Sequence, residues 1–322
     1  MRPIAMRQTS VSTAVVIVLF LAACQGNATT SDAISSGDGG TAVVARTAAS
    51  PSPTGGGETP GGDGEDPGRG DQAVAGASEA LYDPWARVLT EYVDEEGLVD
   101  YAGLAADGRD DLEAFMGTIG SADPSRFSEA EQIAFWINAY NATTIYQVVQ
   151  RYPLESVRDV GTLFGLVGGF FKQKYRVANE ERSVDNIEHD ILRPTYNDAR
   201  IHWTLVCASF GCPRLLRRPY TAADLDPLLT EVSFEFMASP RALHIDDDDD
   251  TLWVTSYFDW YGDDFEAAAG DIVDYILRYA PEDKATWIRE HRDTMRVRFM
   301  DYDWTLNDQS KGPRSRRPVE PS

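Results

Sequence analysis

The amino-acid sequence predicts an α+β fold, in the form of a mainly helical single domain with a small, partly antiparallel sheet and a buried central helix. No aromatic residue occurs between 25 and 78, whereas aromatic residues occur from Tyr82 to Trp304, so that 81–308 is long enough for one domain with a sizeable core. Apolar residues in this range recur mostly at helical spacing. Strand-like segments are few and follow helices in irregular order, which is typical of an α+β domain.

The expected helices all carry apolar residues three or four positions apart. In chain order they are Tyr82–Val93, Leu112–Ile119, Glu129–Arg151, Ser183–Leu192, Thr221–Ala238 and Phe265–Tyr279. The helix over Glu129–Arg151 has the strongest signals, because Ser128 and Glu131 form a capping pattern and Pro153 lies just past its end. It is apolar nearly all round, which predicts a central, buried position.

Strand-like segments complete the predicted fold. Ile201–Cys207 is rich in residues that favour strands. Ala242–Ile245 and Leu252–Ser256 flank the acidic run Asp246–Asp250, which indicates a hairpin with an acidic loop. Arg296–Met300 is expected to form the last strand.

The N-terminus has the composition of a secretory signal. Arg2 and Arg7 precede an apolar run, and Leu21-Ala22-Ala23-Cys24 places small residues before a cysteine. This pattern resembles a bacterial lipoprotein signal that ends in a lipobox, which implies cleavage of 1–23 and acylation of Cys24. We therefore expect an exported protein that is lipid-anchored to the cell membrane or the outer membrane. The alternatives are an ordinary signal peptide with an incidental cysteine and a short membrane anchor.

Composition separates the ends of the chain from the domain. Residues 24–80 are rich in Gly, Pro, Ser and Thr and are expected to form a disordered tether behind the lipidated cysteine. Residues 309–322 are expected to form a disordered tail. The chain has 29 Lys and Arg against 52 Asp and Glu, a net charge of −23, which argues against nucleic acid as a partner.

Several sequence blocks occur in a fixed order along the domain. They are Phe135–Ala142, Ser183–Arg193, Ile201–Pro213 and Phe258–Phe265, with an entry segment Trp85–Tyr101 and an exit segment Tyr302–Asn307. Together they resemble the "domain of unknown function 547" family over about 82–307. The resemblance implies the extent of the domain and implies no reaction, because the function of that family is not established.

The segment Cys207–Pro213 carries both cysteines of the domain, and three interpretations remain open. Cys207 is a candidate nucleophilic thiol, with Gly211 and Pro213 forcing a turn that exposes backbone N–H groups as an oxyanion site. Alternatively, Cys207 and Cys212 form a disulfide or a redox pair, which an oxidising compartment favours. Inert core cysteines are the third interpretation.

A nucleophilic thiol needs a base, and His189 is the preferred candidate. It lies on a short predicted helix with Asp185 one turn earlier and Glu188 beside it. If Ile201–Cys207 is a strand, His202 points to the face opposite Cys207 and cannot be its partner.

Asn138 and Asn141 lie on one side of the central helix. Their amides either tie loops into the core or orient a substrate carbonyl, Asn138 as a catalytic group and Asn141 as a substrate-binding one. Glu188 and Trp260 are further candidate substrate-binding residues, although core packing also explains an aromatic group around Trp260.

No cofactor and no metal site is predicted. Glu188, His189 and His202 lack a recognised metal-ligand spacing. Five consecutive acidic residues at Asp246–Asp250 lack the alternation and the glycine of a calcium-binding loop.

The sequence favours a cysteine-dependent hydrolase or acyltransferase acting on peptide or amide substrates of the cell envelope. In this hypothesis Cys207 is the nucleophile, His189 the base and Asn138 a polarising amide. The alternative is a non-catalytic envelope module that binds or scaffolds a peptide or glycan and contains a structural Cys207–Cys212 disulfide.

Overall fold

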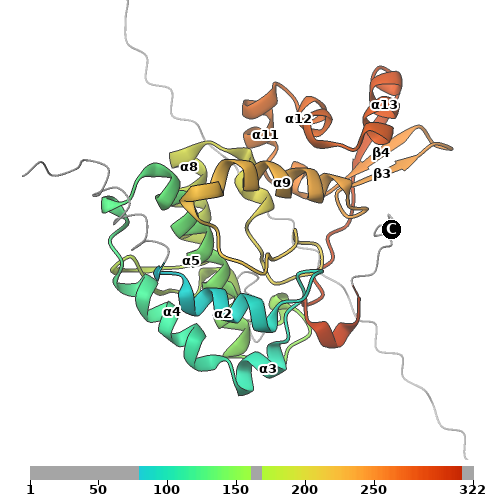
Figure 1. Cartoon of the computed structure of the whole chain (residues 1–322). Coiled ribbons are helices and arrows are strands. Elements are labelled where there is room, and N and C mark those ends of the chain that lie inside the picture. The colour runs from blue at the N-terminus through green and yellow to red at the C-terminus, as the bar shows by residue number, and fades with distance from the viewer. Residues whose placement is uncertain (1–79, 161–168, 314–322) are drawn as a thin grey trace, which may run out of the picture. The chain divides into compact units, whose positions relative to one another are not determined.

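A computed structural model describes residues 80–160 and 169–313 (Figure 1). They lie within one compact unit, Asp63–Ser322. The predicted signal 1–23, the lipidation site Cys24, most of the tether 24–80 and the end of the tail lie outside the described residues. The fold is α+β and mainly helical, with one two-stranded and one three-stranded sheet among the described residues, as predicted.

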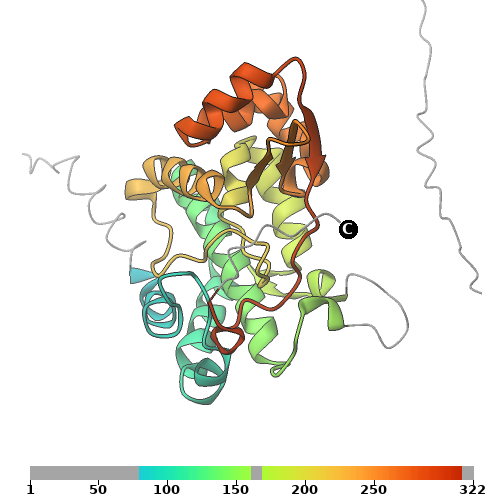
Figure 2. The same cartoon turned by 90° about the vertical axis from the view of Figure 1, so that its right-hand side faces the viewer.

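The N-terminal half of the domain is built from helices. They are α2 (Asp83–Tyr92), α3 (Tyr101–Ala106), α4 (Arg109–Ser121) and α5 (Glu129–Val149). The predictions of α2, α4 and α5 are confirmed, and α3 escaped notice because it has only 6 residues. In Figures 1 and 2, α3 lies near one end of α5, away from β3 and β4.

Helix α5 is the central, buried helix that the sequence predicts. Ser128 accepts a hydrogen bond from the Glu131 backbone, and the Glu131 side chain accepts one from Ser128, which completes the predicted capping box. Nearly every residue from Ile133 to Val149 is buried, and α3 and α4 pack against the helix. This burial makes α5 the scaffold for the segments around it.

A hairpin and a composite helix follow α5. The short helix α6 (Gly169–Lys172) precedes strands β1 (Tyr175–Val177) and β2 (Glu180–Arg182), which pair antiparallel. Next come α7 (Val184–Asn186), a π-helix (Ile187–Leu192) and α8 (Arg193–Tyr196). The predicted helix with Ser183 as its N-cap is confirmed, and its second half is a π-helix. Such π-turns are frequent at functional sites.

The predicted strand Ile201–Cys207 does not exist. Residues Ala199–Trp203 form a 3₁₀-helix, and the chain then continues without a strand partner. The physical reason is burial, since Trp203 is fully buried and stacks against aromatic side chains of α9 and α11. Its surroundings outweigh the strand preference of the local sequence. The argument that strand geometry turns His202 away from Cys207 therefore fails.

The second sheet lies in the C-terminal half of the domain. The helix α9 (Leu225–Ala238) leads to the antiparallel hairpin β3 (Leu243–Asp246) and β4 (Thr251–Val254). Strand β5 (Arg296–Phe299) pairs parallel with β4. The predicted helix, hairpin and last strand are confirmed, and the sheet is partly antiparallel, as expected.

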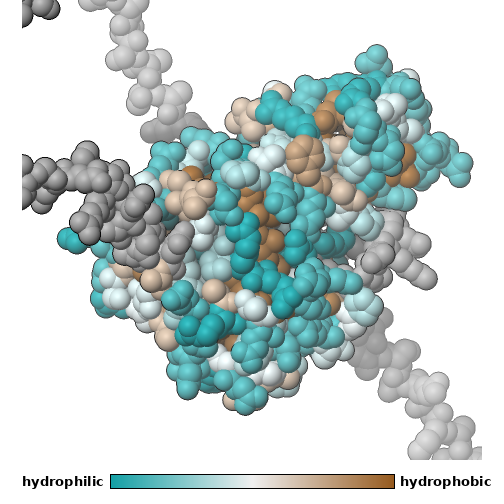
Figure 3. All heavy atoms as spheres, in the orientation of Figure 1, coloured by the Kyte–Doolittle hydropathy of each residue, from teal (hydrophilic) through white to brown (hydrophobic). Residues whose placement is uncertain are grey.

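Short helices follow the sheet hairpin: α10 (Tyr257–Trp260), α11 (Gly262–Ala269), α12 (Ile272–Tyr279) and α13 (Glu282–His291). The sequence predicted one helix over Phe265–Tyr279, which is wrong because the chain breaks at Gly270, whose φ is 98°. Among the described residues, no helix is both long and apolar enough to cross a membrane. On the face in Figure 3, hydrophilic side chains dominate, as expected for an acidic protein.

The ordered structure extends past the predicted boundary at 308. Gln309–Lys311 form a 3₁₀-helix, and the Gln309 side chain donates hydrogen bonds to the carbonyls of Tyr92 and Leu98. The first residues of the predicted tail 309–322 are thus part of the domain, because their polar groups pair with the N-terminal helices.

Candidate functional site

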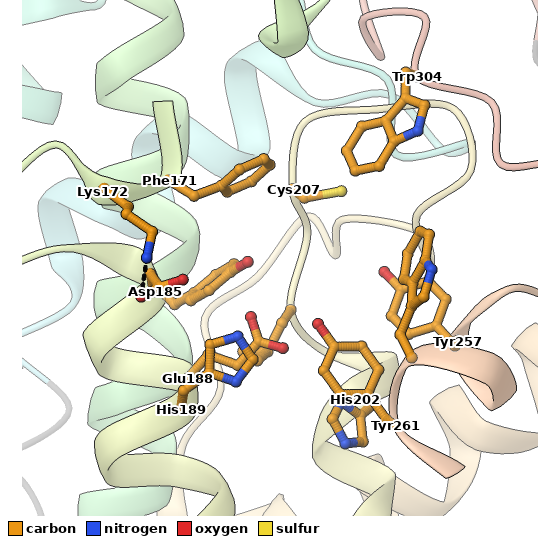
Figure 4. Close-up of a pocket in the computed structure, with 13 residues that line it drawn as sticks. Phe171, Lys172, Asp185, Glu188, His189, His202, Cys207, Tyr257, Tyr261 and Trp304 are labelled. Atoms are coloured by element: carbon orange, nitrogen blue, oxygen red, sulfur yellow. Dashed lines mark ion pairs between the residues drawn. The ribbon is translucent and has the colours of Figure 1, made fainter. Parts of the chain in front are cut away.

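A cavity of about 300 Å³ lies where four parts of the chain meet (Figure 4). They are the composite helix Val184–Tyr196, the segment before Cys207, helix α10 and the C-terminal segment Tyr302–Asn307. Its walls combine aromatic rings with titratable side chains. The lining residues are Tyr140, Phe171, Lys172, Asp185, Glu188, His189, His202, Leu205, Cys207, Tyr257, Trp260, Tyr261 and Trp304. Such a mixture of apolar wall and few polar groups is typical of a ligand-binding site.

Glu188 is the buried carboxylate of the cavity, with 7% of its surface exposed. The phenols of Tyr140 and Tyr261 donate hydrogen bonds to it. Burial and the nearby Glu188 charge raise the pKa of both tyrosines well above the usual value. Both phenols therefore stay protonated at neutral pH and remain donors to the carboxylate.

Both cavity histidines belong to one charged cluster. His202 Nε2 lies 2.7 Å from Asp264 Oδ2, and Arg193 Nε lies at the same distance from that oxygen. Hydrogen bonds from His202 and Arg193 hold the pKa of Asp264 well below its ordinary value. Arg193 Nη1 also lies 2.9 Å from His189 Nδ1, and the His202 ring stacks on Tyr261 with 4.2 Å between centroids.

One nitrogen of this cluster has no hydrogen-bond partner among the described residues. It is His202 Nδ1, which is buried. When His202 Nε2 carries the proton and donates to Asp264, Nδ1 is an unused acceptor on a cavity-lining ring.

Cys207 and Cys212 are joined by a disulfide. Cys207 is partly buried and lines the cavity, whereas Cys212 is fully buried. Two hydroxyl groups, Ser209 Oγ and Tyr302 Oη, each lie 3.1 Å from Cys207 Sγ. The disulfide is thus part of the cavity wall, with one sulfur atom toward the cavity and one toward the core.

The C-terminal segment holds the turn between the two cysteines. Phe210 and Gly211 donate their backbone N–H groups to the carbonyls of Thr305 and Asp303, at 2.8 and 2.9 Å. On the other side of the turn, Arg241 donates to the carbonyls of Phe210 and Cys212. These contacts correct the expectation of exposed N–H donors, because the groups that would form an oxyanion site are already paired.

The structure brings four of the predicted site residues to one cavity: Cys207, His189, Glu188 and Trp260. It also places His202 there, which corrects the expectation that this side chain faces elsewhere. Since the segment before Cys207 is not a strand, its side chains do not alternate between faces.

Asn138 and Asn141 do not line the cavity. The Asn138 side chain exchanges two hydrogen bonds with the backbone of Tyr220. Asn141 donates to the Thr204 carbonyl and accepts from the Val206 N–H, both at 2.9 Å. Their assignment as catalytic and substrate-binding groups is corrected, because both amides are used to hold loops against α5.

Sequence reasoning did not single out Tyr140 of the cavity or Asp264, which lies outside the cavity lining and contacts His202. Tyr140 lies between the two asparagines on α5, and Tyr261 and Asp264 belong to the sequence block Phe258–Phe265. The available signal for Tyr140 was a hydroxyl on a helix that is apolar nearly all round, whereas Asp264 had none, because Asp259 and Asp263 lie in the same block. Asp185 was expected to lie beside His189, but its Oδ2 atom lies 3.7 Å from Lys172 Nζ, and His189 Nδ1 lies 2.9 Å from Arg193 Nη1 instead.

Within the two described ranges, no group of three or more His, Cys, Asp or Glu side chains is arranged to hold a metal ion. The polar groups of the cavity instead pair with one another and with neighbouring tyrosines.

The cluster around Asp264 makes a testable contribution to stability. Asp264→Asn is expected to lower the free energy of unfolding by about 1–3 kcal/mol at pH 7, because His202 and Arg193 lose their charged acceptor. The folded-state pKa of Asp264 is depressed, so its contribution is complete above about pH 4 and decreases as the carboxylate becomes protonated at lower pH. Urea denaturation at pH 7 and pH 3 measures both effects.

The neighbouring exposed carboxylate provides the control for that experiment. Asp263→Asn is expected to change stability by less than about 0.5 kcal/mol. Equal effects of the two substitutions, or a gap between wild type and Asp264→Asn that widens as the pH falls, would contradict the assignment.

The fold and the cavity define a mainly helical α+β domain with an aromatic, carboxylate-bearing pocket beside a disulfide. Residues 124–237 match the family described as "Protein of unknown function, DUF547", which confirms the resemblance over this range. The match contains α5, the π-helix and the Cys207–Cys212 turn. The segments Trp85–Tyr101, Phe258–Phe265 and Tyr302–Asn307 lie outside it. No curated protein and no solved structure matches the chain.

Proposed function

We propose that this protein is an exported lipoprotein whose domain binds a small peptide or glycan ligand of the cell envelope in the cavity described above. The observation that carries the proposal is the combination of aromatic walls, including Trp260 and Trp304, with the buried carboxylate Glu188. Aromatic rings provide stacking surface for a sugar or an apolar side chain, and a buried acceptor orients a polar ligand.

The polar groups of the cavity define the ligand further. Glu188 is an acceptor-only group when ionised, and the rings of Trp260 and Trp304 give the cavity apolar walls. A ligand that carries N–H or O–H donors next to a flat or apolar face matches both features. Peptides and sugars combine these two properties, which is why they are the proposed classes.

The proposed location follows from the N-terminal sequence. The lipobox pattern at Cys24 supports an anchor in the cell membrane or outer membrane, with the membrane as a partner through the lipid. The segment 24–80 has the composition of a flexible tether, which supports a domain held at a distance from the bilayer.

A cysteine-dependent hydrolase or acyltransferase is the second candidate. Cys207, His189 and His202 line the same cavity, which favours thiol chemistry on a bound peptide or amide. Two observations place this candidate second. Cys207 is joined to Cys212, and the backbone N–H groups of Phe210 and Gly211 are paired with carbonyls of the C-terminal segment.

Ligand binding is tested with muropeptides and with their separated peptide and disaccharide parts. Intrinsic tryptophan fluorescence is a suitable signal, because Trp260 and Trp304 line the cavity. Trp260→Ala is expected to weaken binding by about tenfold or more, since it removes a stacking surface worth more than 1 kcal/mol.

Phe234→Ala is the matched control, because Phe234 is also a largely exposed aromatic residue, at 48%, and does not line the cavity. It is expected to leave the affinity unchanged, as measured by calorimetry. Absence of binding by every member of the series, or equal losses in both variants, would overturn the proposal.

A further inference from the structure

The two sulfur atoms of the disulfide differ in accessibility. Cys207 lines the cavity, and Cys212 has 0% of its surface exposed. In the close-up, the Cys207 side chain lies between Phe171 and Trp304 (Figure 4). A thiol that enters the cavity therefore meets the sulfur atom of Cys207 first.

Polar groups lie within hydrogen-bond distance of both sulfur atoms. The backbone N–H of Cys207 donates to Cys212 Sγ at 2.9 Å, and Tyr302 Oη lies 3.0 Å from the same atom. Ser209 Oγ lies 3.3 Å from Cys212 Sγ and 3.1 Å from Cys207 Sγ. A neutral disulfide sulfur is a weak acceptor, whereas a thiolate is a strong one. Ser209 Oγ donates to Tyr302 Oη, and Tyr302 Oη in turn donates to Cys212 Sγ. The two donors to Cys212 Sγ, Tyr302 Oη and the Cys207 N–H, therefore match the charge of a reduced Cys212 sulfur better than that of the disulfide.

The turn that carries the cysteines is held independently of the S–S bond. Contacts from Arg241, Thr305 and Asp303 pair its carbonyl and N–H groups. Asn141 holds the preceding segment through the Val206 N–H. Breaking the bond between the sulfur atoms removes none of these contacts, so the turn is expected to keep its position in the reduced protein.

We propose that Cys207 and Cys212 form a redox-active pair that exchanges with a thiol-bearing ligand admitted through the cavity. The thiolate of the ligand attacks Cys207 Sγ, and a mixed disulfide forms between the ligand and Cys207. The Cys207–Cys212 bond breaks, and Cys212 leaves as a thiolate that accepts hydrogen bonds from the Cys207 N–H and Tyr302. A second thiol then attacks the mixed disulfide, which releases the oxidised ligand as a disulfide and leaves both cysteines reduced.

This activity goes beyond the proposed binding function, which requires no exchange. The protein gains two electrons and the ligand thiols lose two, so that the reaction is balanced by the thiol class that the proposal names. The reverse reaction, in which a ligand disulfide reoxidises the pair, uses the same sulfur of Cys207. In this reverse direction the ligand disulfide is reduced to thiols, and the Cys207–Cys212 disulfide is restored.

The first experiment uses the membrane-extracted full-length protein and reduced glutathione as the probe. Alkylation under native conditions, followed by peptide mass spectrometry, measures the redox state of Cys207 and Cys212 separately. We expect reversible reduction of the pair without loss of the thermal unfolding transition. Reduction that occurs only after denaturation would overturn the proposal and leave a structural disulfide.

The second experiment assigns the attacked sulfur. Cys212→Ser leaves Cys207 as a single thiol in the cavity wall, and oxidised glutathione is expected to form a mixed disulfide with it. Cys207→Ser leaves the buried Cys212, which is expected to react at least tenfold more slowly. Equal rates for the two variants would contradict the assigned direction. If either variant fails to fold, the reduction of the wild type still decides whether the pair is redox-active.

The third experiment tests the donors around the sulfur atoms. Tyr302→Phe removes the hydroxyl that lies near both sulfur atoms. Because the thiolate loses this donor, alkylation of the reduced pair is expected to slow by about tenfold at neutral pH. Tyr279→Phe, outside the cavity, is the control and is expected to leave the rate unchanged. Equal rates in wild type and Tyr302→Phe would mean that the hydroxyl does not stabilise a thiolate, and would overturn its role.

The proposal of disulfide exchange and the proposal of ligand binding are tested by independent measurements. Tryptophan fluorescence on the oxidised protein reports muropeptide binding, and glutathione reactivity reports the cysteine pair without any muropeptide. Loss of one signal therefore leaves the other as an independent result.

Discussion

Replacing Asn141 by alanine is expected to lower the free energy of unfolding by about 3 kcal/mol. The side chain is 2% exposed and bonds both the Thr204 carbonyl and the Val206 N–H. Alanine leaves two buried backbone groups without a partner and opens a small cavity beside α5. Urea denaturation with a fluorescence readout measures the loss.

The position of Asn141 gives this substitution a second expected effect. It holds the segment that leads directly to Cys207, so the disulfide of Asn141→Ala is expected to be reduced by glutathione faster than that of the wild type. Asn138→Ala is the matched control, because Asn138 forms the same two kinds of hydrogen bond, with Tyr220. It is expected to destabilise the protein to a similar degree without this local effect. Equal acceleration in both variants would indicate general loosening instead.

The second large effect concerns the anchor. Cys24→Ser is expected to release the protein to the aqueous phase or to leave its signal uncleaved, because the hydroxyl cannot take the place of the acylated thiol. The measurement is detergent-phase partitioning of the two proteins after extraction from membranes. The apolar acyl chains that a lipidated cysteine carries provide the partitioning free energy, about 0.8 kcal/mol for each buried CH₂ group.

Cys212→Ser is the control for partitioning, since it removes another cysteine and leaves the lipobox intact. It is expected to partition like the wild type. If Cys24→Ser has lost residues 1–23 and still stays in the detergent phase, the lipid anchor is excluded.

Local sequence correctly predicted those helices and strands whose capping and turn signals lie within a few residues of one another. Ser128 and Glu131 cap α5 through contacts that span one helical turn, and the surrounding apolar residues determine burial of the whole helix. The hairpin β3–β4 was also predictable, because the acidic run Asp246–Asp250 separates two strand-like segments directly. In these cases, all the residues that decide the structure are near neighbours in sequence.

The segment Ile201–Cys207 demonstrates the opposite case. Its composition favours a strand, but the burial of Trp203 and the amide of Asn141 decide its structure. The amide forms hydrogen bonds with the Thr204 carbonyl and the Val206 N–H, which a neighbouring strand would otherwise pair. Because of this change, His202 lines the same cavity as Cys207. Strand geometry therefore could not decide whether His189 or His202 is the partner of Cys207.

The sequence by itself determined the domain class, the central helix, the family resemblance and a set of residues that includes Cys207, His189, Glu188 and Trp260. Only the tertiary structure decided that these residues share a cavity with Tyr140 and Tyr261, that the asparagines are structural and that Cys207 is bonded to Cys212. The physical reason is that periodicity and capping act over a few residues, whereas a cavity and its hydrogen bonds form between segments that meet only when the core packs.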